Sequence, residues 1–348
     1  MKFVILGHFI SGKDLKKAFP FGKYLPLIIL EIITSLVPAK KSFRVVSHFN
    51  VFEKAEGWMI GLAMTPRQMM FLPKNLVRGK ILQAVLFAQE KLGAEVLMLG
   101  ALTSPLTSAG KWLTENPKVK IKITTGNTYT AAATIEAAEK ALALANLDLS
   151  KIKLAIVGAA GVIGEAVTKY FNQKGINLIL VERSWEKFER LKPFLTGNNF
   201  KLTCDIKEII GADIVITATS HPEAAIKPDF LKKNAIVVDV AEPPDLPKNI
   251  NQVRPDVIAI DGGRILWKKV DLGMDINLPK NTGFACMTEV ILQALEQCQE
   301  NFVGSVDMGH LQRTKAWAEK WGFKLANFTS FNKIVPLEKF NNLKQKYG

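Results

Sequence analysis

The sequence is poor in the residues that disulfide frameworks and metal sites require. It has three cysteines, Cys204, Cys286 and Cys298, and no two of them stand in CxxC spacing. Its four histidines are scattered and form neither an HxxxH nor an HExxH pattern. Isolated cysteines in odd number argue against a disulfide framework, and the absence of clustered ligands argues against zinc. We therefore expect no metal site.

Long apolar runs are also missing. The most apolar segment, Tyr24–Val37, is about half the length of a membrane-spanning helix and contains Pro26 and Glu31. Its composition indicates a core or interfacial helix. The first residues, Met1-KFVILGHFISG, lack a lengthy apolar region with a small-residue cleavage site and indicate a strand and turn, not an export signal. We expect no integral membrane segment and a cytoplasmic location.

Acidic residues are outnumbered by basic ones. There are 46 Lys and Arg against 32 Asp and Glu, which gives a formal charge of +14. A basic surface speeds encounters with anionic partners, but the lysines are dispersed and no basic run is interleaved with aromatic residues. An acidic partner is favoured over nucleic acid. At 348 residues and 48% hydrophobic content, the chain is long enough for two domains.

The first 127 residues mix strand and helix signals and predict an N-terminal α/β substrate-binding domain, residues 1–127. Strands are expected at 1–6, 43–51 and 95–99, an apolar helix at 25–36 and an amphipathic helix at 78–92. From Asn127 a run of strong helix formers predicts a linking helix.

Strands and helices then alternate, which is typical of a doubly wound parallel sheet covered on both faces. This predicts a Rossmann-like α/β domain over residues 128–298, with residues 299–348 packing back on the N-terminal domain. The expected strands are 153–157, 177–181, 200–204, 213–217, 235–239 and 257–261, and the expected helices are 164–173, 185–195, 207–210 and 284–298.

A glycine turn lies between the first of these strands and its helix. Gly158, Gly161 and Gly164 follow the apolar strand Lys153–Val157, and the apolar residues Val162 and Ile163 open the helix. Glycines at this spacing permit a tight turn, close approach to a pyrophosphate and close helix packing, while the helix N-terminus supplies amides. We predict dinucleotide binding here; the alternative is a structural turn that binds nothing.

The next strand ends in residues that bear on the choice of cofactor. Glu182 can accept hydrogen bonds from a ribose 2′-hydroxyl, whereas Arg183, with Ser184 beside it, can pair with a 2′-phosphate. NADPH and NADH both remain open at this point.

Cys286 lies in the opening turn of the helix predicted at 284–298. With Asn281 or Thr282 as N-cap, the unpaired amides and the helix dipole would favour a reactive thiolate. The alternative is a small buried hydrophobe, because apolar residues recur at helical spacing around it. Cys204 and Cys298 have no such setting and are interpreted as structural.

Several motifs occur in an order that resembles the cyanobacterial-type long-chain acyl-[acyl-carrier-protein] reductases, which form aldehydes. The resemblance implies that Cys286 is the nucleophile, that NADPH is the reductant, and that the substrate is a fatty acyl thioester on an acidic acyl carrier protein. The motifs are Gly7-HFIS, Phe71-LP, Gly79-KILQAVLFAQEKLGA, Leu99-GALTS, Thr124-TGNTYTA, Val157-GAAGVIGEAV, Asp261-GG and Phe284-ACMTEVIL.

The chain departs from that family at Tyr129, where the family has histidine, at the Glu182–Arg183 pair and over Arg264–Met274. The GNT segment and the run Thr217–Ser220 also resemble shikimate dehydrogenase-like enzymes. We include Thr219 and Ser220 of this run among the predicted cofactor-binding residues.

The leading hypothesis is NAD(P)H-dependent reduction of an acyl thioester, acyl-ACP or acyl-CoA, to an aldehyde through a cysteine acyl-enzyme. The apolar segments 25–36 and 84–92 would hold the acyl chain or simply form a core. One alternative is a dehydrogenase of a small polar acid or amino acid. Another is a nucleotide-binding regulator that senses NADPH without chemistry.

Overall fold

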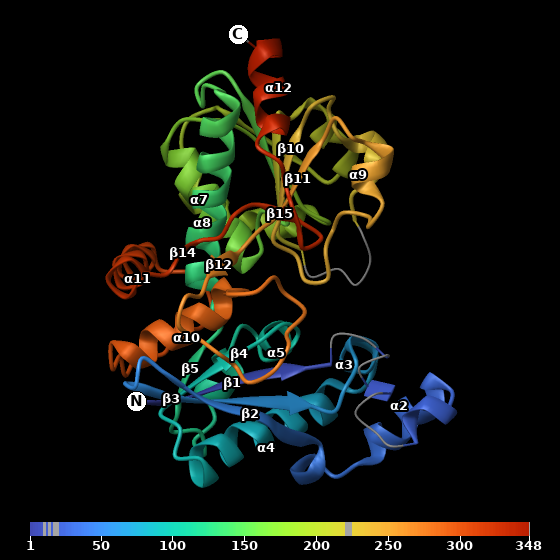
Figure 1. The fold of residues 1–348 in the computed structure, drawn as a ribbon. Coiled ribbons are helices and arrows are strands. Elements are labelled where there is room, and N and C mark those ends of the chain that lie inside the picture. The colour runs from blue at the N-terminus through green and yellow to red at the C-terminus, as the bar shows by residue number, and fades with distance from the viewer. Residues whose placement is uncertain (10–11, 13–14, 17–20, 220–224, 348) are drawn as a thin grey trace. The chain divides into compact units, whose positions relative to one another are not determined.

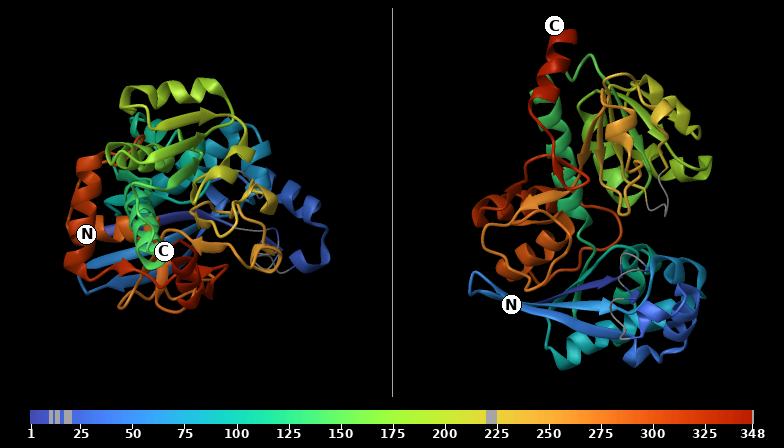
Figure 2. Two further views of the ribbon diagram at one scale, coloured as in Figure 1. Left: turned by 90° about the horizontal axis from the view of Figure 1, so that it is seen from above. Right: turned by 45° about the vertical axis from the view of Figure 1, so that its right-hand side comes forward.

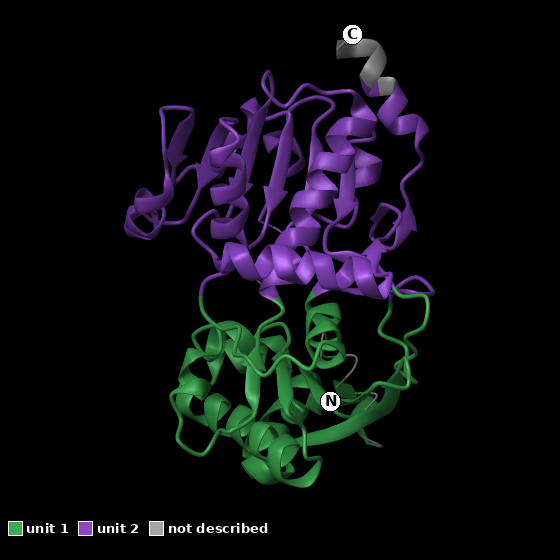
Figure 3. Cartoon of the chain, turned by 90° about the vertical axis from the view of Figure 1, so that its left-hand side faces the viewer, with its two compact units in different colours: residues 1–126, 267–277, 286–304 green, residues 127–266, 278–285, 305–348 purple. Residues whose placement is uncertain are grey.

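The computed structural model describes the chain except for residues 10–11, 13–14, 17–20, 220–224 and 348. The chain forms two compact units (Figure 3). Unit 1 comprises residues 1–126, 267–277 and 286–304, and unit 2 comprises residues 127–266, 278–285 and 305–348. The first segment of unit 1 thus ends one residue before the predicted domain boundary.

Unit 1 is built on a five-stranded sheet in the order β2-β3-β1-β4-β5, in which only β2 runs antiparallel to its neighbour (Figure 1). Four consecutive residues of β1 are buried, as expected of a parallel strand covered on both faces. The strands are β1 (Lys2–His8), β2 (Phe43–Val51), β3 (Ala55–Leu62), β4 (Val96–Leu99) and β5 (Lys122–Thr124).

Helix α4 (Lys74–Lys91) lies along one face of this sheet (Figures 1 and 2) and packs on it through apolar residues. Val77, Ile81 and Val85 recur at four-residue spacing and are fully buried against strand residues. The other helices of unit 1 are α2 (Leu27–Leu36), α3 (Pro66–Phe71), α5 (Thr103–Leu106), α6 (Lys111–Thr114) and α10 (Ala285–Leu295).

Unit 2 contains a six-stranded, wholly parallel sheet in the order β11-β10-β9-β6-β7-β8. Numbered from its first strand, this is the 3-2-1-4-5-6 order of doubly wound nucleotide-binding folds, with the switch point between β6 and β9. The predicted fold class is confirmed. The strands are β6 (Lys153–Val157), β7 (Asn177–Val181), β8 (Phe200–Thr203), β9 (Ile214–Thr217), β10 (Ile236–Asp239) and β11 (Ile258–Asp261).

The helices of unit 2 are α7 (Asn127–Ala145), α8 (Val162–Gln173), α9 (Ile250–Val253), α11 (Met308–Trp321) and α12 (Glu338–Tyr347). Where a helix is predicted at 185–195, the structure has two short 3₁₀ helices, η3 (Trp185–Arg190) and η4 (Lys192–Phe194). Pro193 lies within the second of them, where its missing N–H prevents a continuous α-helix. Short antiparallel strands complete the unit: β12 (Arg264–Leu266), β13 (Thr282–Phe284), β14 (Lys324–Leu325), β15 (Thr329–Ser330) and β16 (Lys333–Ile334).

Two segments group differently from the predicted domains. Residues 305–348 belong to unit 2, because α11 and α12 pack on α7 and β14 pairs with β12. Residues 286–304 belong to unit 1, because Phe302 continues the hydrogen bonding of β5. In the described part of the chain, no helix combines the length and apolar character needed to cross a membrane.

Candidate active site

The glycine turn after β6 is packed so closely that side chains are excluded from it. Gly158 has φ +80°, in the left-handed region, and its carbonyl accepts the Gly161 N–H at 2.9 Å. A β-carbon on Gly164 would lie 2.1 Å from the Gly158 oxygen, so only hydrogen fits there. Helix α8 begins directly after Gly161. This turn can bring backbone amides and a helix N-terminus to a pyrophosphate, as the sequence predicts.

Glu182, the residue after β7, lies against this turn. Its Oε1 accepts the Ala160 N–H at 2.7 Å, and its Oε2 lies 3.0 Å from Lys187 Nζ. The side chain is almost fully buried, so the lysine and the amide offset the cost of burying its charge. Arg183 beside it is exposed, and Ser184 precedes η3. Glu182, which would favour NADH, therefore lies beside the basic residues Arg183 and Lys187, which would favour NADPH.

Thr219 follows β9, the strand beside β6, and its methyl carbon would lie 3.4 Å from a β-carbon on Gly158. Its hydroxyl donates to Asp245 at 2.6 Å. The predicted site residues Gly158, Gly161, Gly164, Glu182 and Thr219 thus lie around one edge of the unit 2 sheet. Ser220 lies outside the described residues.

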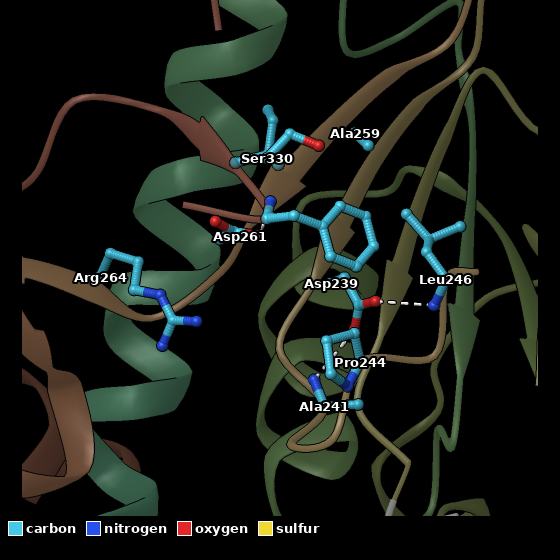
Figure 4. A pocket seen from close by; sticks show the side chains of 10 residues that line it. Asp239, Ala241, Pro244, Leu246, Ala259, Asp261, Arg264 and Ser330 are labelled. Atoms are coloured by element: carbon cyan, nitrogen blue, oxygen red, sulfur yellow. Dashed lines mark hydrogen bonds between the residues drawn. The ribbon is translucent and has the colours of Figure 1, made fainter. Parts of the chain in front are cut away.

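The same edge holds a buried acidic pair that was not among the residues predicted from the sequence. Asp239, the last residue of β10, accepts the amides of Ala241 and Leu246 (Figure 4), and Asp245 accepts the hydroxyl of Thr217. Burial, and then the negative charge of Asp245, raise the pKa of Asp239 to about 8. No sequence motif signals this pair, because the two residues are joined by a loop of no regular structure.

Asp239, Asp261 and Arg264 line a small pocket (Figure 4). Asp261 accepts the Thr329 hydroxyl at 2.7 Å and the Phe331 amide at 2.8 Å, so it fixes the loop between β15 and β16. Arg264 lies over the Phe284 ring at 4.4 Å and is 3.8 Å from Glu242. These contacts link the carboxyl end of β11 to the loop between β15 and β16, and β12 to β13.

Cys286 differs from every other residue of α10. Ala285 and all residues from Met287 to Leu295 are buried, including Thr288, Glu289 and Gln293, whereas Cys286 is partly exposed. It is the second residue of the helix. An otherwise buried helix therefore has one partly exposed residue, the cysteine in its first turn.

The predicted N-cap of this helix is wrong. Neither Asn281 nor Thr282 lies directly before the first turn, because Thr282 belongs to β13 and the helix begins at Ala285. Pairing of β13 with β12 keeps the chain extended up to Phe284. The Ala285 amide donates to the Gly263 carbonyl at 2.8 Å, which anchors the helix start to the end of the turn after β11.

The backbone of Gly126 lies directly against Cys286. Gly126 has φ +69°, and a β-carbon built on it would lie 2.4 Å from both the Cα and the Cβ of Cys286. The Gly126 amide donates to Thr124 Oγ1 at 3.1 Å, and that hydroxyl donates to the buried Glu289 Oε1 at 2.6 Å. In the sequence the Thr124-TGN motif is known only as part of a family resemblance. In the structure, Thr124 and Gly126 of this motif contact the helix that contains Cys286.

Tyr129 and Thr130 lie in the first turn of helix α7, which begins directly after Gly126. Tyr129 is buried, and burial raises the pKa of its phenol above the usual value. A β-carbon on Gly263 would lie 3.7 Å from Thr130 and 3.9 Å from Ala285. Within unit 2, the starts of α7 and α10 and the carboxyl end of β11 are therefore close neighbours.

Comparison with known proteins agrees with this geometry. The profile of the shikimate / quinate 5-dehydrogenase family matches residues 137–262, which contain the glycine turn and most of the unit 2 sheet. The matched part, with its sheet order and glycine turn, supports an NAD(P)-dependent oxidoreductase. It says nothing of the substrate.

Three curated relatives match over more of the chain. The aminotransferase PigE of Serratia sp. is 27% identical over 73% of this chain and 31% of its own length. The long-chain acyl-[acyl-carrier-protein] reductase of Synechococcus elongatus is 28% identical over 67% of this chain and 72% of its own length. The glutamyl-tRNA reductase of Methanocaldococcus jannaschii is 27% identical over 74% of this chain and 58% of its own length. The chain thus spans only about a third of the first of these relatives.

Proposed function

We propose that the protein reduces a fatty acyl thioester to an aldehyde with NAD(P)H, through an acyl group carried on Cys286. The observation that carries the proposal is the partial exposure of Cys286 in the first turn of an otherwise buried helix. Cys204 and Cys298 are partly exposed as well, but neither lies in the first turn of a helix, so the combination is particular to Cys286. The names of the Synechococcus and Methanocaldococcus relatives, both reductases, support the reaction type.

In the proposed reaction, the Cys286 thiolate attacks the thioester carbonyl, and its sulfur forms a bond to the acyl carbon. The bond from that carbon to the carrier sulfur breaks, and the carrier leaves as a thiol after taking a proton. Amides in the first turn of α10 would stabilise the oxyanion. If NAD(P)H is held at the glycine turn before α8, it would supply a hydride to the acyl carbon; the carbon–sulfur bond of Cys286 would then break, which would release the aldehyde and restore the thiolate.

Cys286 directly follows a residue of unit 2 in the chain. The amide of Ala285, directly before Cys286, is bonded to Gly263 at the carboxyl end of the unit 2 sheet, where doubly wound folds bind their ligands. NADPH is the proposed reductant, because Lys187 neutralises Glu182 and Arg183 adds a further positive charge beside it. An acyl carrier protein is the proposed donor because it is acidic and this chain carries a charge of +14.

The intact mass of the protein tests the proposal. After incubation with palmitoyl-ACP or palmitoyl-CoA and no nicotinamide, the wild type should gain one acyl group, and NADPH should then remove it as aldehyde. Cys286→Ser should gain no thioester-linked acyl group, whereas Cys204→Ser and Cys298→Ser should behave as the wild type. Failure of every acyl thioester to label the wild type would overturn the proposal and leave reduction of a small polar substrate.

A further inference from the structure

Helix α2 carries its apolar side chains on the outside. Ile28, Ile32 and Leu36 are 47%, 54% and 77% exposed, and Ile29 and Ile33 beside them are also exposed. Residues at four-residue spacing share one face of a helix, so these side chains form an apolar stripe. Of the two expectations for this segment, a core helix or an interfacial helix, the first is therefore wrong.

The buried residues of α2 are Leu30, Glu31 and Thr34, and two of the three are polar. Thr65 Oγ1 donates to Glu31 Oε1 at 2.6 Å, and Gln68 Nε2 donates to Thr34 Oγ1 at 2.9 Å. Lys80 Nζ donates to the Thr34 carbonyl at 3.2 Å. Turning the helix to bury its isoleucines would leave these groups without partners, including the charge of Glu31. The hydrogen bonds thus hold the apolar stripe outward.

Neighbouring exposed side chains extend the stripe. Phe21 and Tyr24, in the turn before α2, are each 74% exposed, and Phe71, at the end of α3, is 79% exposed. The bonds from Thr65 and Gln68 hold α3 beside α2 (Figure 1). We call this set the α2 face: Phe21, Tyr24, Ile28, Ile29, Ile32, Ile33, Leu36, Met70 and Phe71. Large contiguous apolar surfaces on a folded protein mark interaction sites.

The charges around the α2 face have one sign. Segments 21–52 and 63–89, both fully described, contain a single acidic residue, Glu31, which is buried and lies 3.5 Å from Arg67. Exposed basic residues in the same segments are Lys23, Lys40, Lys41, Arg44, Arg67 and Lys74. The occupant of this surface should therefore be apolar and negatively charged.

We propose that the α2 face docks on the surface of an anionic lipid bilayer. Helices that lie in the membrane interface combine an outward apolar face with basic residues, and aromatic side chains are common at that level. A second copy of the chain would bring the same positive charges and be repelled. An acidic protein would match the charge but would need an apolar surface of its own, whereas a bilayer offers both. The inference goes beyond the proposed reaction and does not depend on it.

Vesicle sedimentation with the full chain tests the inference. The wild type should pellet with vesicles of phosphatidylglycerol and phosphatidylcholine at least tenfold more strongly than with phosphatidylcholine alone, and salt should weaken the binding. Ile32→Glu and Leu36→Glu should each lower the binding at least tenfold. The matched control is Ile210→Glu, because Ile210 is 56% exposed on unit 2, close to the 54% of Ile32.

Charge reversal provides a second, independent measurement. The double variant Lys40→Glu/Lys41→Glu should lose the preference for anionic vesicles, whereas Lys118→Glu/Lys120→Glu, which changes the net charge equally at exposed positions before β5, should keep it. The substituted positions are all exposed, so the variants should fold. Equal pelleting with both vesicle types, or unchanged binding of Ile32→Glu, would overturn the inference. If the wild type is a dimer and Ile32→Glu is a monomer, the α2 face would instead bind a second copy of the chain.

Discussion

Gly126 presses its backbone against Cys286 so closely that any side chain at position 126 would occupy the space of the cysteine. A β-carbon at position 126 would lie only 2.4 Å from the Cys286 Cβ. Gly126 stands at the end of β5 and Cys286 in the first turn of α10, and Thr124 and Glu289 link the same two elements by a hydrogen bond of 2.6 Å. Two contacts, the packing of Gly126 and the hydrogen bond from Thr124 to Glu289, therefore fix the position of Cys286.

Gly126→Ala should displace the start of α10 and reduce turnover at least about a hundredfold, because misplacement by about 1 Å has that effect on catalysis. The matched control is Gly93→Ala. Gly93 also has positive φ, +64°, but nothing lies within 4 Å of a β-carbon there. Turnover and the rate of thiol alkylation, measured on both variants, separate steric displacement from backbone strain. Equal losses in the two variants would contradict the role assigned to the Gly126 contact.

Gly161→Val should abolish nicotinamide binding while leaving the protein folded. A β-carbon on Gly161 would lie 3.1 Å from the Gly158 oxygen, a tight but tolerable contact, whereas the larger side chain would fill the space over the turn. Gly211→Val in the same unit is the control, since its β-carbon would meet only Ile179 at 3.8 Å. Titration calorimetry with NADPH and NADH measures the effect. Unchanged affinity in Gly161→Val would mean that the turn is structural.

Glu182→Ala should raise the ratio of NADPH to NADH affinity at least tenfold, or about 1.4 kcal/mol. Removing the carboxylate frees Lys187, whose ammonium lies 3.0 Å from it, to pair with a 2′-phosphate. Because Glu182 also accepts the Ala160 amide, the control is Lys187→Ala, which keeps that bond and should shift the ratio the other way. Should both variants change the ratio in the same direction, the carboxylate would act on the turn and not on the ribose.

The nucleotide-binding unit could be predicted from the sequence because its signals are local. Buried strands such as Lys153–Val157 are continuous apolar runs, and the three glycines mark the turn after this one. The surroundings of Cys286 could not be predicted, because Gly126 lies against it and Thr124 bonds to Glu289 of the same helix, and both come from a segment distant in the chain. The outward apolar face of helix α2 could not be predicted for a related reason. Its apolar pattern also fits a core helix, and only the hydrogen bonds of Glu31 and Thr34 with residues of α3 and its N-cap fix which face points inward.

Asp239 should make the protein less stable as the pH rises from about 4 to about 8. Its pKa in the folded state is about 8, above the usual value of 3.8, because burial and the nearby Asp245 disfavour its charge. The folded state therefore holds a proton that the unfolded state loses, and stability present below pH 4 is lost as the pH approaches 8. A tenfold change in this equilibrium is worth about 1.36 kcal/mol, so the loss is a few kcal/mol.

Asp239→Asn should flatten this pH dependence and raise the free energy of unfolding at pH 8, measured by urea denaturation at several pH values. Asp256 supplies a comparison of opposite sign, because hydrogen bonds from Arg254 hold its pKa below the usual range. Asp256→Asn should weaken the protein at neutral pH and reduce the stability that is lost on acidification. A wild type whose stability between pH 5 and 8 is flat, and which Asp239→Asn leaves unchanged, would show that Asp239 is ionised in the folded state.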